Sequence, residues 1–140
     1  VFNDTSSSTF NSINKKNNYF KKKKFILSFF NLTNIYFHRE ISSEIKPLEK
    51  FDFMKQEKNI DILKIDTEGY EYNVLKGINL EQFKKIRYIY FEHHYDLMIN
   101  KNYKFSDINQ FLNKNNFFIL FKNKMSLRKT FEYIYENKYQ

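Results

Sequence analysis

The sequence contains no cysteine, which excludes disulfide bonds and thiolate metal sites. Such a composition is typical of a reducing compartment, and we expect a cytoplasmic protein. Glycine occurs twice and proline once, so turns must be formed largely by asparagine, serine and aspartate. The longest apolar run, residues 117–121, is far shorter than a membrane-spanning helix, and no membrane span is expected.

The apolar residues that are present are mainly phenylalanine and tyrosine. A chain of 140 residues with 41% hydrophobic and 20% aromatic residues has enough apolar material for one domain with a modest core. The formal net charge of +8 comes mostly from lysines scattered among asparagines, with one dense run at residues 21–24. Because the sequence begins at Val1 without an initiator methionine or a recognisable leader, we expect an upstream portion, with any targeting signal, to be missing.

The chain divides into a loop-rich stretch and an α/β core. Residues 1–24 are rich in serine, threonine, asparagine and lysine and lack periodicity, which predicts a poorly ordered loop. In residues 25–140, alternating strand and helix patterns predict an α/β fold with a mostly parallel sheet, and leave an antiparallel return open for the last strand. Gly77 is predicted to end its helix as a left-handed cap, and Ser106 to cap the start of the last helix. The predicted strands are residues 34–41, 60–65, 86–92, 117–121 and 131–135, and the predicted helices are residues 47–55, 70–76, 80–84 and 105–113.

Residues 60–77 carry the strongest chemical signal, because an apolar strand pattern runs straight into an acidic turn and then a short helix pattern. The turn offers Asp66 and Glu68, and the next predicted strand ends in Glu92 and His93. The two strands are expected side by side at the centre of the sheet. Since the carboxyl ends of parallel neighbours open on the same side, these four side chains are predicted to converge. They would supply a general base for a hydroxyl proton, or hard oxygen ligands for a divalent cation.

Other interpretations of these residues remain open. Asp66 can cap the following helix, and Glu68 and Glu71 sit where the helix dipole favours negative charge. For Glu71 this structural role is the favoured interpretation. His93 and His94 are adjacent and cannot both point into one pocket from an extended chain, and we favour His93 as the base.

Residues 64–77 closely resemble the signature of FkbM family methyltransferases, in which a Lys-Ile-Asp-x-Glu-Gly-x-Glu core is followed by Val-Leu-Lys-Gly. Residues 4–9 and 47–51 resemble further elements of that family, and Glu92 resembles the glutamate that ends its next strand. The resemblance implies a class I S-adenosylmethionine-dependent methyltransferase with a Rossmann-like sheet, acting on sugar or natural-product hydroxyls. It also implies that Asp66 and Glu68 act in catalysis, with Asp66 contributing to cofactor binding.

Two parts of the family pattern have no counterpart in this sequence, namely the glycine-rich loop after the first strand and the acidic residue that holds the ribose. The two glycines, Gly69 and Gly77, both belong to the motif, so no glycine-rich loop can form. We therefore expect residues 1–140 to be a single truncated domain, with a partial class I sheet that lacks the N-terminal strands. Such a domain is expected to expose apolar sheet surface, to need a missing N-terminal half or an oligomer partner, and to be inactive alone.

The favoured hypothesis is the C-terminal part of an O-methyltransferase that uses S-adenosylmethionine, with a divalent metal as an option, on a small hydroxyl acceptor such as a saccharide. An alternative is a non-catalytic basic module for RNA or anionic glycans, which rests on the lysine run and its aromatic neighbours. A solvated loop explains that run more simply, and no specific nucleic-acid partner is expected. A third hypothesis is a degenerate remnant that packs against a partner chain.

Overall fold

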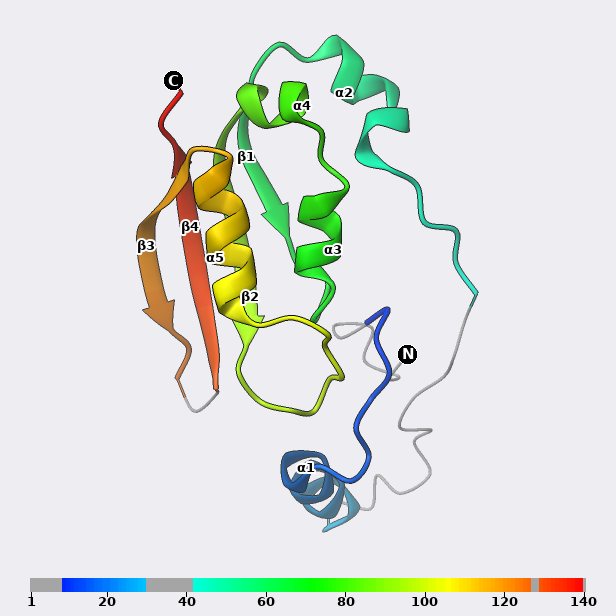
Figure 1. Ribbon diagram of the computed structural model, residues 1–140. Coiled ribbons are helices and arrows are strands. Elements are labelled where there is room, and N and C mark those ends of the chain that lie inside the picture. The colour runs from blue at the N-terminus through cyan, green and yellow to red at the C-terminus, as the bar shows by residue number, and fades with distance from the viewer. Residues whose placement is uncertain (1–8, 30–41, 127–128, 140) are drawn as a thin grey trace.

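The computed structural model of the protein describes residues 9–29, 42–126 and 129–139. Its strands are β1 (Ile60–Ile65), β2 (Ile86–His94), β3 (Phe117–Lys124) and β4 (Thr130–Asn137). Its helical elements are α1 (Asn18–Phe29), η1 (Leu48–Lys50), α2 (Asp52–Gln56), α3 (Glu71–Lys76), α4 (Leu80–Lys85) and α5 (Phe105–Lys114). The strands form one sheet, and α3, α4 and α5 lie together on one of its faces (Figure 1).

The sheet has the strand order β1-β2-β4-β3. β1 pairs in parallel with β2, as predicted, whereas β4 pairs antiparallel with both β2 and β3. The α/β prediction is confirmed, but the prediction of a mostly parallel sheet is wrong, because one pairing is parallel and two are antiparallel. The cause is the position of β4, which inserts between two strands that run in the same direction. In the described part of the chain β1 pairs with β2 alone, so it lies at an edge of the sheet and not at the predicted centre.

The face of the sheet under the helices forms the core. Side chains alternate between the two faces of a strand, and strand pairing places Ile65, Phe91 and Tyr133 in one row on this face. Phe91 and Tyr133 are both fully buried, and their rings stack with centroids 5.6 Å apart. The helices complete this core with buried apolar side chains, among them Leu75 of α3, Phe83 of α4, and Ile108 and Leu112 of α5.

The opposite face of the sheet, the open face, carries apolar side chains in contact with solvent. Strand pairing places Ile62, Tyr88, Glu136 and Phe118 in one row across it. Ile62 is 61% exposed and Phe118 is 43% exposed, and Phe121 in the next row is 51% exposed. The expected exposure of apolar sheet surface is therefore confirmed for the residues that the structure describes.

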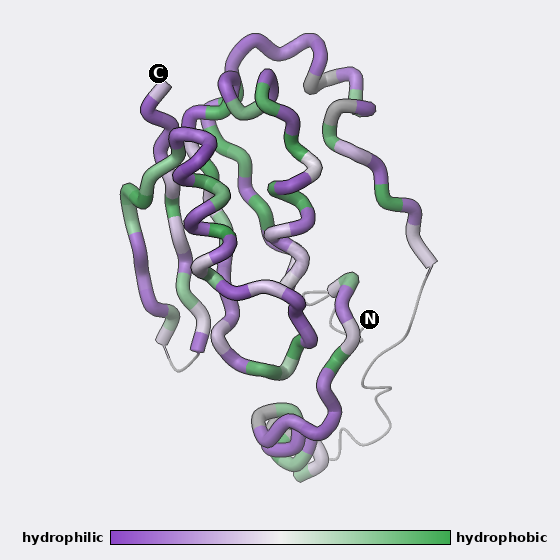
Figure 2. The backbone as a smooth tube through the Cα atoms, in the orientation of Figure 1, coloured by the Kyte–Doolittle hydropathy of each residue, from purple (hydrophilic) through white to green (hydrophobic). Residues whose placement is uncertain are grey.

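The N-terminal region differs from the loop prediction. Because α1 covers residues 18–29, the loop predicted through residue 24 is wrong over residues 18–24. Lysine is a good helix former, and neither glycine nor proline interrupts this stretch. Figure 2 shows hydrophilic and hydrophobic residues interspersed along α1, and no helix in the described ranges has the length and apolar character needed to cross a bilayer. The strand predicted at residues 34–41 lies outside the described residues.

Two other helices have boundaries that differ from those predicted. The helix predicted at residues 47–55 is divided into η1 and α2, because Phe51 between them has extended backbone, with φ −87° and ψ 127°. Ser106 lies inside α5 and does not cap it. The helix start is held instead by Asp107, whose Oδ2 accepts the backbone N–H of Lys104 at 2.7 Å.

The two glycines differ from each other in backbone conformation. Gly77 has φ −80°, so the predicted left-handed cap is wrong. Its N–H still donates to the carbonyls of Asn73 at 3.2 Å and Val74 at 3.0 Å, which keeps it in the helical conformation. Left-handed backbone occurs instead just after β1, at Glu68 with φ 48° and Gly69 with φ 97°.

Gly69→Ala is expected to lower the free energy of unfolding by about 1–3 kcal/mol. At φ 97° an alanine is strained, and its Cβ would lie 2.9 Å from Ile99 Cγ2. Gly77→Ala is the matched control, because right-handed backbone accepts alanine and the change should stay within about 1 kcal/mol. Urea denaturation measures both variants, and equal stabilities would contradict the conformation described for Gly69.

Candidate active site

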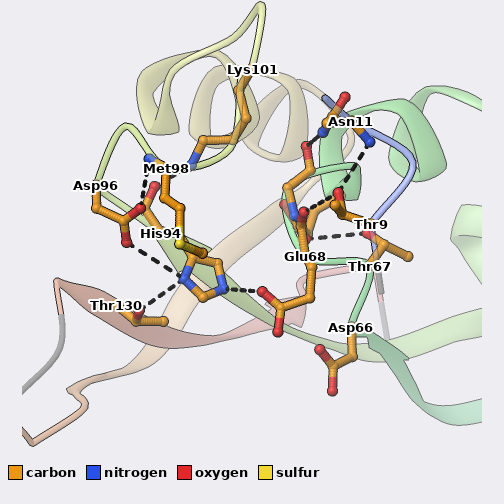
Figure 3. Close-up of polar contacts among 12 residues, drawn as sticks. Thr9, Asn11, Asp66, Thr67, Glu68, His94, Asp96, Met98, Lys101 and Thr130 are labelled. Carbon is orange, nitrogen blue, oxygen red and sulfur yellow. Dashed lines mark hydrogen bonds and ion pairs between the residues drawn. The ribbon is translucent and has the colours of Figure 1, made fainter. Parts of the chain in front are cut away.

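The acidic turn, residues 66–70, follows β1 and brings Glu68 against β2. The Glu68 carboxylate lies 2.9 Å from His94 Nε2, at the end of β2 (Figure 3). On the other side of the ring, Thr130 Oγ1 of β4 lies 2.9 Å from His94 Nδ1. Both ring nitrogens of His94 are therefore engaged, which fixes the orientation of the imidazole at the carboxyl end of the parallel pair.

His94 is the electrostatic partner of the acidic turn. Its side chain is 11% exposed and that of Glu68 is 21% exposed, so solvent screens their attraction only weakly. Burial lowers the pKa of His94, but the hydrogen bond and charge of Glu68, together with the charge of Asp96, outweigh burial and raise this pKa above its ordinary value of 6.5. Near neutral pH His94 is therefore protonated, and paired with Glu68, in a larger fraction of the molecules than a histidine with the ordinary pKa would be.

Asp66 and Glu92 lie near this pair. Glu92 and His94 are two residues apart in β2 and therefore point to the same face, which is the open face. Burial raises the pKa of Glu92, and the negative charge of Asp66 raises it further. Lys64 balances part of the charge, with its Nζ 3.2 Å from Asp66 Oδ2. The structure thus brings two of the predicted site residues, Glu68 and Glu92, close to His94, whereas Asp66 interacts with Glu92 and pairs with Lys64.

His93 points to the helix-covered face, away from these carboxylates. It is 3% exposed, and its Nδ1 has no hydrogen-bond partner in the described part of the chain. Burial, and then the charge of Lys101, lower the pKa of His93 to about 3. The geometry therefore gives no support to the predicted role of His93 as a base. The spacing of Glu92 and His94 could have identified His94, because strand residues two apart share a face. Around His93 lie the rings of Tyr95, Phe105 and Tyr103, at centroid distances of 4.8, 5.7 and 6.0 Å.

His93→Phe is expected to remove part of the acid sensitivity of folding. A histidine in the unfolded chain has a pKa of about 6.5, whereas burial holds the pKa of His93 at about 3 in the folded protein. Between these values the unfolded chain binds a proton that the folded chain does not, so stability is retained above about pH 6.5 and falls as the pH decreases. The free energy of unfolding of the variant, relative to that of the wild type, should increase by about 1.4 kcal/mol for each unit by which the pH falls from about 6 to about 4. Urea denaturation at several pH values measures this, and parallel profiles for the two proteins would contradict it.

A segment near the N terminus, residues 9–14, contacts the acidic turn and the segment that follows β2. Thr9 Oγ1 donates to the Glu68 carbonyl at 2.7 Å, and Asn11 Nδ2 donates to the carbonyl of the next residue at 2.5 Å (Figure 3). Further backbone contacts join residues 12–14 to residues 98–100. Sequence reasoning missed Thr9 and Asn11, because nothing in a serine- and asparagine-rich loop indicates contacts with residues 59 and 58 positions away.

The residues that the structure describes form no metal centre. Within them, no group of three or more histidine, aspartate and glutamate side chains is arranged to hold a metal ion, so the predicted divalent metal has no support. They also contain no glycine-rich loop. The space beside Gly69 is filled by Ile99 and Lys101, and Gly77 ends α3, so neither glycine belongs to a glycine-rich loop around a cofactor.

Comparison with known proteins associates the chain with a family. The family model of the methyltransferase FkbM domain matches residues 3–119. The matched stretch contains β1, the acidic turn, β2 and α5, and hence every residue of the candidate site except Thr130. Neither a search of curated proteins nor a search of solved structures found a match.

Proposed function

The chain belongs to the methyltransferase FkbM domain family, and we propose that it methylates a hydroxyl oxygen of a small acceptor such as a saccharide. Family membership makes it a methyltransferase, for which a Rossmann-like fold and S-adenosylmethionine as the methyl donor are implied. The observation that carries the choice of oxygen is the Glu68 and His94 pair, 2.9 Å apart at the carboxyl ends of β1 and β2. A hydroxyl is a weak nucleophile until its proton is removed, and this pair supplies a positioned base.

Each residue of the site has its own proposed role. Glu68 accepts the hydroxyl proton of the acceptor, which leaves an electron pair on the oxygen for the new C–O bond. His94 holds the Glu68 carboxylate in place and balances its charge before the proton is transferred. Glu92 lies on the same face as His94 and accepts hydrogen bonds from neighbouring hydroxyls, which suits a polyhydroxylated acceptor. The donor, when bound, would supply an electrophilic methyl group, whose bond to the donor sulfur would break as the C–O bond forms, with the neutral thioether as the leaving group.

The donor site is proposed to extend beyond these 140 residues. Asp66, at the end of β1, is the proposed contact to the donor from this chain. A glycine-rich loop would have to come from an N-terminal part of a longer chain or from a partner. The two glycines of this chain cannot form one, because Gly69 lies in the acidic turn against Ile99 and Gly77 ends α3. The 140-residue chain alone is therefore proposed to be inactive.

The proposed function is tested with a chain extended upstream, incubated with isotope-labelled S-adenosylmethionine and a panel of saccharides. We expect label in a methyl ether of one hydroxyl, and no label in the deoxy analogue that lacks this hydroxyl. The 140-residue chain serves as the control without a complete donor site. Transfer to nitrogen or carbon acceptors, with none to any hydroxyl, would contradict the proposal.

A further inference from the structure

Glu71 is a buried carboxylate that the proposed chemistry leaves unused. It is the first residue of α3 and is 1% exposed. A buried charge is costly unless hydrogen bonds and an opposite charge compensate it. Both oxygens of Glu71 accept hydrogen bonds. Oε1 accepts them from the Gly69 N–H at 2.7 Å and the Thr67 hydroxyl at 3.2 Å, and Oε2 accepts one from the Tyr103 hydroxyl at 2.6 Å.

The bonds to Oε1 reach both sides of Glu68. Thr67 precedes Glu68 and Gly69 follows it, so a single carboxylate oxygen of Glu71 bridges the two neighbours. Glu68 itself has φ 48°, a left-handed conformation that a residue with a long side chain rarely adopts unless the surrounding structure holds it. Glu71 therefore fixes the backbone from which the Glu68 side chain leaves.

The bond to Oε2 connects the same turn to residues 95–104, the segment between β2 and α5. Tyr103 lies in this segment and is 7% exposed. Lys101 of the same segment donates to the carbonyl of His94, and its positive charge acts on Glu71. Glu71 thus lies between the turn that carries Glu68 and the segment that continues from His94.

We infer that Glu71 is a positioning residue, whose carboxylate sets the distance between Glu68 and His94 by clamping the acidic turn to Tyr103. Its consequence for catalysis rests on the proposed function, whereas its geometry does not. This positioning role depends on the length of the Glu71 side chain, because Oε1 must reach donors in the acidic turn while Oε2 reaches the Tyr103 hydroxyl. A helix-dipole role needs only negative charge at the start of α3, so any carboxylate at this position would serve it.

The test is the pKa of the His94 imidazole, followed by NMR in the full chain. Glu68→Gln removes the charge of the pair and gives the reference for a released histidine. Glu71→Asp keeps the charge but shortens the side chain by one methylene, so the pKa of His94 should fall by about one unit towards that reference. Glu71→Gln keeps the length of the side chain. Both contacts can also be retained, because the amide oxygen can accept from the Gly69 N–H and the amide nitrogen can donate to the Tyr103 hydroxyl. This variant should leave the pKa of His94 within about 0.3 units of the wild type.

Glu81→Asp is the matched control, because Glu81 also lies in the first turn of a six-residue helix, α4, but its side chain is 76% exposed. It should not move the pKa of His94. If Glu71→Asp does not fold, Tyr103→Phe takes its place, since it removes one hydrogen bond of the clamp and retains the ring. The inference is overturned if Glu71→Asp, or Tyr103→Phe in its place, leaves the pKa of His94 unchanged. It is also overturned if Glu71→Gln lowers this pKa as far as Glu71→Asp does.

The failure of this inference is distinguishable from failure of the proposed function. If the pKa of His94 responds to Glu71 as expected while Glu68→Gln retains full methyl transfer, the clamp exists and the proposed base is wrong. If Glu68→Gln abolishes methyl transfer while the pKa of His94 ignores Glu71, the base is right and the clamp is wrong.

Discussion

Glu68→Gln is expected to lower the rate constant of methyl transfer about 100-fold to 10,000-fold, the usual effect of removing a positioned base. Glutamine retains the shape of the side chain and can still meet His94, but its amide cannot accept the hydroxyl proton of the acceptor. Asp66→Asn, which removes the neighbouring carboxylate at the end of β1, is expected to reduce the rate as well. Single-turnover rates and melting temperatures are measured for each variant in the chain extended upstream.

The competing interpretation of these carboxylates makes a different prediction. If Asp66 and Glu68 only stabilise the start of α3, each substitution costs about 1 kcal/mol of stability and leaves the chemistry intact. Glu81→Gln, in the first turn of α4, is the control for a solvent-exposed glutamate at a helix start. Near-normal turnover combined with an earlier melting temperature in both site variants would show that the catalytic assignment is wrong.

Local sequence pattern was sufficient to predict the parallel pair of strands and the helices that cover it. The β-branched residues of β1, followed directly by an acidic turn, and the mostly buried alternation of β2 are strong local signals. The position of β4 was not predictable in this way. Its eight residues alternate like any half-buried strand, and nothing in them specifies insertion between β2 and β3 rather than addition at an edge.

The candidate site also has a part that the sequence predicted and a part that it did not. Asp66, Glu68, Glu92 and His93 were predicted to converge because parallel strands end on the same side of a sheet. The structure places Glu68 and Glu92 by His94 and Asp66 near Glu92, while His93 points to the other face. The two-residue spacing would have selected His94 once Glu92 was included in the site, but the sequence did not show that the turn places Glu68 on that same face. That placement depends on left-handed backbone at a glutamate, which sequence propensity does not predict.

Phe91→Ala is expected to lower the free energy of unfolding by about 3–5 kcal/mol, because it opens a cavity at the centre of the helix-covered face. Phe91 is fully buried in β2, and its ring stacks on Tyr133 and Tyr135 with centroids 5.6 and 5.7 Å away. The neighbouring rings belong to β4, a strand fixed at both edges, so they cannot move far enough to fill the space.

Phe121→Ala is the matched control for Phe91→Ala, since it removes the same atoms from the same sheet. Phe121 is 51% exposed on the open face, so its loss should cost about 1 kcal/mol or less. Urea denaturation of the 140-residue chain measures both variants. Similar losses for the two would mean that the open face is as tightly packed as the helix-covered face, in contradiction to the burial of Phe91 and the exposure of Phe121 described above. A large difference would locate the stability of this chain on the helix-covered side of the sheet.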